Sequence, residues 1–204
     1  MDIQLNFINR SNDANNSKVV IFAKNVATNL AEAVAWRVIQ NCGQGDNHPF
    51  VHPMTTQVGV SDSWGNYTPL QHAANGQQFS MVMGTSGDVL RESGPAASPS
   101  EIEVRNGLPK GGINAGIYKG GKLYAQETAI RPQRTAVFQF KPTIWIGVAS
   151  QVVQGQVMNS AIVSQINTEI SLLGVASADI VMTGGGPGAK STPFEFSLAN
   201  VEYA

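Results

Sequence analysis

The sequence predicts an all-β protein, built as a two-sheet antiparallel β-sandwich of the jelly-roll or cytolysin-like kind with at most one or two short helices. Three observations predict it: short apolar runs recur along the whole chain, several of them alternate apolar and polar side chains, and turn-forming residues separate them about every ten residues. A βαβ fold would need helices between its strands, and few segments fit one. Because 204 residues is a common size for one sandwich, we expect a single domain over residues 1–204.

The first apolar runs predict an opening hairpin. Ile3, Leu5 and Phe7 recur at the period of a half-buried strand. Residues 10–17 consist almost entirely of turn-forming side chains, and residues 19–22 resume as a second strand. We therefore expect these two strands to pair.

Residues 28–42 fit two patterns. As a helix, the segment would be capped by Thr28 or Asn29; as a strand, it would alternate around Trp36. We favour one helical turn at residues 29–33, followed by a strand that places Trp36 in the core.

Glycine and proline mark the loops of the remaining chain. Residues 43–53 and 91–100 are predicted to be loops, because each stretch holds two prolines. The clearest hairpin joins residues 113–119 to 122–130 through Gly120-Gly121, since tight primed turns require positive φ. Further strands are expected at residues 57–60, 78–83, 101–105, 136–140, 144–148, 157–166, 169–173, 179–182 and 194–203. No fixed-period repeat stands out, so a propeller or solenoid is not expected.

The chain carries little charge. Charged residues make up 13% of it, against about 25% in average globular proteins. With a net charge of −1, repulsion between copies is weak, so we expect self-association into a homo-oligomer. The 13 basic residues form no cluster, which argues against nucleic acid as a partner.

The cellular setting is predicted from three features: the N-terminus, the length of the apolar runs and the cysteine count. The N-terminus lacks a basic stretch followed by an apolar run, and no apolar run approaches the ~18 residues of a transmembrane segment. The single cysteine, Cys42, cannot form an internal disulfide and fits a reducing compartment. We expect cytoplasmic synthesis without a signal peptide, and leave release or non-classical export open.

Residues 184–191 come close to a phosphate-binding loop. The pattern G-x-x-x-x-G-K-[ST] places backbone N–H groups and a lysine around phosphates at the start of a helix. Here Ala189 stands in the position of the second glycine, and a strand is expected from residue 192 onward. We interpret the stretch as a flexible loop and expect no nucleotide cofactor.

The other candidate reactive groups are few. Asp46, His48 and His52 are residue types that ligate zinc, and they predict a metal site only if the loop brings them together. No serine lies in a G-x-S-x-G motif, and a lone cysteine such as Cys42 is usually an apolar core residue. We expect Glu103 to be an exposed residue of an edge strand. The sequence therefore predicts no catalytic residues, no cofactor and no enzyme.

One loop suggests ligand binding. Trp64 and Tyr67 lie in a turn where a large ring is not needed for a core, and Asp62 and Asn66 beside them can hydrogen-bond hydroxyl groups. These four residues are predicted to bind a glycan or a membrane-surface headgroup. The alternative is that the loop folds back and caps the end of the sandwich.

The opening hairpin followed by a strand that bears Trp36 resembles the β-sandwich cytolysins of the aegerolysin and actinoporin kind. The resemblance covers the first third of the chain and includes no diagnostic motif, so no binding residue is carried over. Three functions stay open: a structural, self-assembling protein that pairs through residues 144–148 or 194–198 if either lies at a sheet edge; a glycan- or lipid-headgroup-binding module; and a metal-dependent enzyme.

Overall fold

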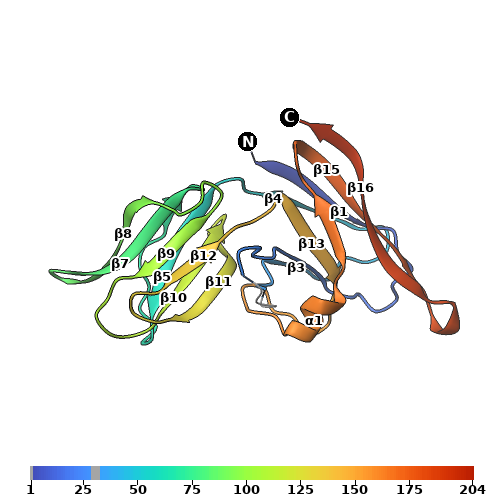
Figure 1. The fold of residues 1–204 in the computed structure, drawn as a ribbon. Helices are drawn as coiled ribbons and strands as arrows, with labels where there is room; N and C mark the ends of the chain where they lie inside the picture. Colours follow the sequence, from blue (N-terminus) through green and yellow to red (C-terminus); the bar gives the residue numbers. More distant parts are fainter. Residues whose placement is uncertain (1, 29–32) are drawn as a thin grey trace. The chain divides into compact units, whose positions relative to one another are not determined.

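The computed structural model describes residues 2–28 and 33–204, and within these ranges it is all-β (Figure 1). The predicted all-β class is confirmed. The two-sheet arrangement is not, because the sixteen strands of the described residues form four sheets of four strands each. Most pairs are antiparallel, but two are parallel. The described residues group into two compact units. Whether these units fold together as the single domain expected from the sequence stays a prediction.

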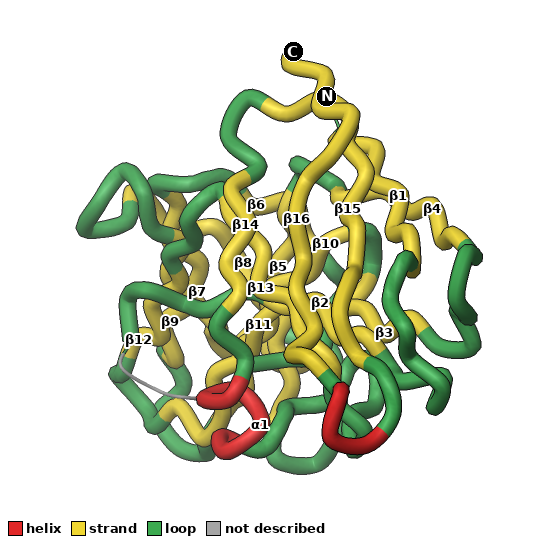
Figure 2. The backbone as a smooth tube through the Cα atoms, turned by 90° about the vertical axis from the view of Figure 1, so that its right-hand side faces the viewer, coloured by secondary structure: helices red, strands yellow, loops and turns green. Residues whose placement is uncertain are grey.

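The unit that holds both chain ends, here called the terminal unit, comprises Met1–Ala23, Ala31–Met54 and Pro142–Ala204. Its strands are β1 (Ile3–Asn9), β2 (Val19–Phe22), β3 (Arg37–Ile39), β4 (Asn47–His52), β13 (Thr143–Val148), β14 (Thr168–Ser171), β15 (Val175–Gly185) and β16 (Thr192–Tyr203). They form two sheets with the orders β16-β15-β1-β4 and β14-β13-β2-β3, and β1 runs parallel to β15. Figure 2 shows β16, β15, β1 and β4 side by side in this order.

The second unit, here called the central unit, comprises Lys24–Leu30 and Thr55–Lys141. Its strands are β5 (Thr56–Asp62), β6 (Gln71–Ala73), β7 (Gln77–Gly84), β8 (Gly87–Pro95), β9 (Ile102–Asn106), β10 (Ile113–Lys119), β11 (Lys122–Ile130) and β12 (Thr135–Phe138). Their sheet orders are β11-β10-β5-β6 and β12-β9-β7-β8, and β7 runs parallel to β9. The predicted hairpin between β10 and β11 is confirmed, with Gly120 at φ 57° and Gly121 at φ 71°.

Two predicted loops contain strands. Residues 47–52 form β4 although Pro49 lies in its middle, and residues 91–95 belong to β8. Both strands lie at the edge of a sheet, where one side of the backbone needs no partner and a proline is tolerated. The proline pattern predicted loops because it does not distinguish a loop from an edge strand.

A capped helix forms where the sequence predicted a strand. The strand predicted at residues 157–166 is wrong, because this stretch forms the short helix α1 (Ser160–Gln165). Asn159 begins the helix by accepting a hydrogen bond from the Ala161 N–H at 2.8 Å. The helical turn expected at residues 29–33 falls almost wholly outside the described residues. Trp36 is buried as predicted, one residue before β3.

The two units share one strand topology. Replacing β1–β4 by β9–β12 and β13–β16 by β5–β8 converts both sheet orders of the terminal unit into those of the central unit. The parallel pair β1–β15 then corresponds to the parallel pair β9–β7. One eight-strand pattern therefore occurs twice along the chain, as β1–β8 and β9–β16, and each unit combines four strands from each occurrence.

A buried asparagine marks the same position in both units. Asn9 ends β1 and Asn106 ends β9, and both are fully buried. The Oδ1 of Asn9 accepts the Ser11 N–H at 3.0 Å, and the Oδ1 of Asn106 accepts the Leu108 N–H at 3.1 Å. In each unit the next backbone N–H donates 2.9 Å to a methionine carbonyl, from Arg10 to Met182 and from Gly107 to Met81. The correspondence therefore extends from strand order to individual hydrogen bonds.

Candidate functional site

The predicted ligand loop follows β5 in the central unit and is closed by one carboxylate. The Oδ1 of Asp62 accepts the backbone N–H of Trp64 at 2.8 Å and of Asn66 at 2.9 Å. Its Oδ2 accepts the Asn66 Nδ2 at 2.7 Å. The Asp62 N–H in turn donates to the Asn66 carbonyl at 3.0 Å. These four hydrogen bonds define the conformation of the loop.

The hydrogen bonds that the Asp62 carboxylate accepts lower its pKa, with the Asn66 side chain as the largest cause. A carboxyl whose pKa is lower in the folded state stabilises that state above its ordinary pKa. This contribution is lost only as the pH falls through the lowered value. The loop is therefore closed by a charged carboxylate at neutral and mildly acidic pH.

Two aromatic rings of this loop are exposed to solvent. The exposed fraction of the side chain is 88% for Trp64 and 74% for Tyr67. Gly65 between them has φ 86°, a conformation that favours glycine. Beyond the rings, the hydroxyl of Thr68 accepts the Val60 N–H at 3.0 Å, which ties the loop back to β5. The rings are displayed from a hydrogen-bonded loop, so the predicted alternative, a loop folded over the core, does not describe Trp64.

A cavity of about 510 Å³ lies beside this loop. Its lining residues come from the end of β5, the β5–β6 connection, β6, β7 and β8: Asp62, Asn66, Tyr67, Thr68, Pro69, Gln71, Met81, Gly87, Asp88, Val89 and Leu90. Three of the four residues predicted from the sequence, Asp62, Asn66 and Tyr67, therefore line one cavity. Trp64 does not line it but projects from the same loop.

Sequence reasoning missed the far wall of this cavity. Gln71 on β6 donates from its Nε2 to the Leu90 carbonyl on β8 at 2.7 Å, which leaves the Oε1 of Gln71 as an acceptor. Asp88 at the start of β8 adds a second carboxylate, and Met81 on β7 adds an apolar surface. No local pattern marks these residues, because they reach the loop only through sheet pairing and the Gln71–Leu90 hydrogen bond.

The three predicted metal ligands are not brought together. His48 and His52 lie four residues apart on the strand β4, which separates them by about 13 Å at the rise of a strand. The ring of His52 packs edge-on against Trp36, with centroids 5.2 Å apart. The Oδ2 of Asp46 accepts the Gly43 N–H at 3.1 Å. In the part of the chain that the structure describes, no three His, Cys, Asp or Glu residues group as metal ligands would.

The remaining candidate reactive groups, Cys42 and Glu103, are both buried. Burial raises the pKa of the Cys42 thiol, and the charge of Asp46 adds to the effect, so the reactive thiolate is disfavoured. The expectation that Glu103 is exposed on an edge strand is wrong. Glu103 is buried on β9, which lies between β12 and β7, and it accepts hydrogen bonds from the Gln78 side chain and the Ala97 N–H.

The near phosphate loop is followed by a strand, as predicted. After β15 ends at Gly185, a single 3-10 turn, η1 (Gly188–Lys190), leads into β16. A helix of several turns, which would orient its N–H groups toward phosphates, does not follow.

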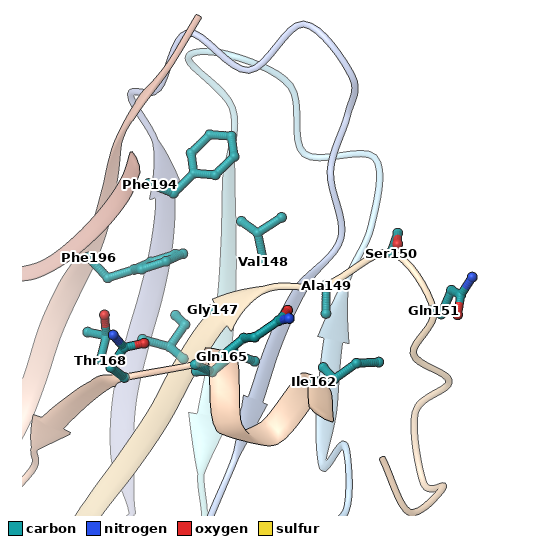
Figure 3. A pocket seen from close by; sticks show the side chains of 13 residues that line it. Gly147, Val148, Ala149, Ser150, Gln151, Ile162, Gln165, Thr168, Phe194 and Phe196 are labelled. Atoms are coloured by element: carbon teal, nitrogen blue, oxygen red, sulfur yellow. The ribbon is translucent and has the colours of Figure 1, made fainter. Parts of the chain in front are cut away.

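The terminal unit has a cavity of its own, of about 410 Å³ (Figure 3). Phe194 and Phe196 of β16 lie on one side, and Gln165 and Ile162 of α1 lie on another. The described residues that line it include no charged side chain. They are Ile146, Gly147, Val148, Ala149, Ser150, Gln151, Ile162, Gln165, Ile166, Asn167, Thr168, Phe194 and Phe196.

Comparison with protein-family models, with curated proteins and with solved structures finds no match for this chain. Within residues 2–28 and 33–204, no helix has the length and apolar character needed to cross a membrane.

Proposed function

We propose that the chain is a non-catalytic binding module for a neutral glycan, which binds at the cavity beside the β5–β6 loop of the central unit. One observation carries the proposal. A hydrogen-bonded loop holds Asp62, Asn66 and Tyr67 at one cavity and displays Trp64 from the same loop.

The chemistry of the lining matches a sugar. A pyranose ring offers an apolar C–H face to an aromatic ring and hydroxyl groups to amides and carboxylates. Tyr67 supplies the ring, and the Asn66 and Gln71 side chains supply amides. The Oδ2 of Asp62 accepts only one hydrogen bond within the loop, which leaves it acceptor capacity for a hydroxyl.

The charges at the cavity favour a neutral glycan over an anionic lipid headgroup. Asp62 and Asp88 line the cavity, and the described lining includes no Lys or Arg. An anionic phosphate would be repelled by the two carboxylates, whereas a neutral sugar would not. Liposome sedimentation serves as the discriminating control, because binding to anionic vesicles would contradict this assignment.

Replacing Tyr67 by alanine is expected to weaken glycan binding by about tenfold, because an aromatic contact is worth roughly 0.5–1.5 kcal/mol beyond the area that it buries. A glycan array identifies the bound sugar, and isothermal titration measures the change in affinity. Tyr203→Ala is the matched control, since Tyr203 is also 74% exposed but lies at the end of β16. Equal affinity in Tyr67→Ala and Tyr203→Ala would contradict the proposed site.

The architecture that presents this site is proposed to be a β-sandwich in each unit. Side chains from the two sheets of a unit support the proposal where they meet. In the terminal unit Trp36, next to β3, packs on Phe50 of β4 with ring centroids 6.5 Å apart. In the central unit Tyr124 of β11 packs on Phe140, two residues beyond β12, at 5.1 Å.

A second candidate function is self-association through β16. From the sequence, residues 144–148 or 194–198 are expected to pair with another copy if either segment lies at a sheet edge, and the two segments differ in this respect. Residues 144–148 lie in β13, which is paired on both sides, whereas residues 194–198 lie in β16 at a sheet edge. None of the twelve residues of β16 is buried. A long edge strand of this kind can pair with the same strand of another copy.

If β16 mediates self-association, Ser197→Lys is expected to shift the chain from dimer to monomer, because a lysine on an exposed edge opposes strand pairing. Size-exclusion chromatography with light scattering over a dilution series measures the mass. Ser86→Lys in the turn between β7 and β8 is the control for added charge. A wild-type chain that stays monomeric at high concentration would rule out this candidate function.

A further inference from the structure

The two cavities occupy the same position in the shared topology. Strand β13 corresponds to β5, β14 to β6 and β16 to β8. The terminal cavity lies where β13 ends, along the connection from β13 to β14 and against β16. The central cavity lies where β5 ends, along the connection from β5 to β6 and against β8.

The strand register extends this match to residue pairs. Ile146 of β13 and Val58 of β5 each come directly before a glycine, which makes them equivalent positions. Ile146 pairs with Thr168, and Val58 pairs with Gln71, so Thr168 and Gln71 correspond. Both Thr168 and Gln71 line their cavities.

The opposite walls correspond in the same way. Met182 of β15 pairs with Phe196, and Met81 of β7 pairs with Leu90. The two methionines are matched by the backbone hydrogen bonds that they accept from Arg10 and Gly107. Phe196 and Leu90 therefore form equivalent walls.

A glycine lies at the equivalent point of β13 and β5, and the glycine of β13 lines the terminal cavity. Gly147 of β13 lies in the run Ile146-Gly147-Val148, and Gly59 of β5 lies in Val58-Gly59-Val60. A Cβ at Gly147 would lie 2.7 Å from Ile166, and a Cβ at Gly59 would lie 2.7 Å from Leu70. In both units the missing side chain lets the connecting segment pack directly on the strand.

We infer that the terminal cavity is a second carbohydrate site, so that the chain binds two neutral sugar units, one in each unit. The inference rests on the proposed function of the central cavity and adds a site that the sequence did not predict. Its basis is the matched position of the two cavities together with the chemistry of the terminal one.

The terminal cavity has the groups that a neutral sugar requires. Phe194 and Phe196 of β16 offer two aromatic rings beside the cavity (Figure 3), and both residues are partly buried. Gln165, Asn167 and Thr168 supply amide and hydroxyl groups. Because none of the described residues that line this cavity is charged, neither an anion nor a cation finds an opposite charge among them, and stacking with neutral hydrogen bonds governs binding.

The test measures stoichiometry in the full-length chain. The probes are linear neutral oligosaccharides of glucose, mannose and N-acetylglucosamine, titrated by calorimetry into wild type, Tyr67→Ala, Phe196→Ala and the double variant. We expect two sites in wild type, one of which is weakened about tenfold in each single variant, and both of which are weakened in the double variant. Val201→Ala, a half-exposed change on β16 outside the cavity, is the matched control and should keep both sites. Phe196→Leu, which introduces the residue found at the equivalent position of β8, separates loss of the ring from loss of packing.

The other outcomes distinguish a failure of the terminal site from a failure of the central site. If wild type shows one site and Tyr67→Ala weakens it, the terminal site does not exist and the proposed function of the central cavity stands. If wild type shows one site and Phe196→Ala weakens it, the central assignment is wrong. If Phe196→Ala and Phe196→Leu both retain two sites of wild-type affinity, or if no probe binds wild type, the inference is overturned. Near-ultraviolet circular dichroism confirms that each variant keeps its tertiary structure.

Discussion

Replacing Asn106 with alanine is expected to lower the free energy of unfolding by about 3 kcal/mol, since each buried polar group left without a partner costs roughly 1–3 kcal/mol. The Nδ2 of Asn106 donates to the carbonyls of Gly111 at 2.9 Å and Ile130 at 2.8 Å, and its Oδ1 accepts the Leu108 N–H. Alanine removes the side-chain amide and leaves all three backbone groups without this hydrogen-bond partner. Chemical denaturation followed by circular dichroism measures the change, and Asn75→Ala at an exposed turn is the control.

Asn9→Ala is expected to have an effect of similar size in the terminal unit. Its Nδ2 donates to the Cys42 carbonyl at 2.8 Å, and its Oδ1 accepts the N–H and the hydroxyl of Ser11. The pair of variants also tests the expected single domain. If the chain unfolds as one domain, both substitutions shift one transition; if the units unfold separately, each shifts its own. A loss below about 1 kcal/mol in both variants would contradict the structural role assigned to these asparagines.

Trp36→Ala is expected to cost about 4 kcal/mol, because truncating a buried tryptophan leaves a cavity that its neighbours do not refill. Trp36 is 1% exposed, and its ring packs on Phe50 and His52. The guanidinium of Arg37 lies 5.4 Å from the ring centroid. The same denaturation measurement applies.

Trp64→Ala is the matched control for this prediction, because Trp64 is 88% exposed. Its loss is expected to change the free energy of unfolding by no more than about 0.5 kcal/mol. Equal destabilisation by the two tryptophan substitutions would show that Trp36 is not a core residue.

Local chemistry explains which parts of the fold the sequence predicted. Gly120-Gly121 predicted the β10–β11 hairpin, because positive φ is a property of the turn alone. The strand β4 was missed because its proline is compatible with an edge strand, and sheet edges are set by distant partners. The helix α1 was missed because the apolar run at residues 157–166 outweighed the capping residue Asn159.

The repeated topology had no visible sequence signal. Equivalent strands share apolar character and a few residues, such as Asn9 with Asn106 and Gly147 with Gly59, but no common motif. The pairing of β1 with β15 joins residues more than 160 positions apart, and each unit mixes strands from both occurrences of the pattern.

In the candidate site, local residues could be predicted from the sequence, whereas residues brought in by strand pairing could not. Asp62, Asn66 and Tyr67 could be predicted because a turn supplies them within a few residues. Gln71 and Asp88 could not, because strand pairing and the Gln71–Leu90 hydrogen bond bring β6 and β8 to the loop. The metal site predicted from His48 and His52 assumed a loop, and the strand that forms instead holds the two rings apart.

A nuclear magnetic resonance titration tests the central claim most directly. A ¹⁵N-labelled chain is titrated with the neutral oligosaccharide that binds best on the array. The account predicts saturable shifts of the Asn66 and Gln71 side-chain amides and of the Trp64 indole N–H, with the Trp36 indole unchanged. Shifts that omit Asn66 and Gln71, or saturating binding with no change at either, would contradict the assignment of the cavity beside the β5–β6 loop as a glycan site.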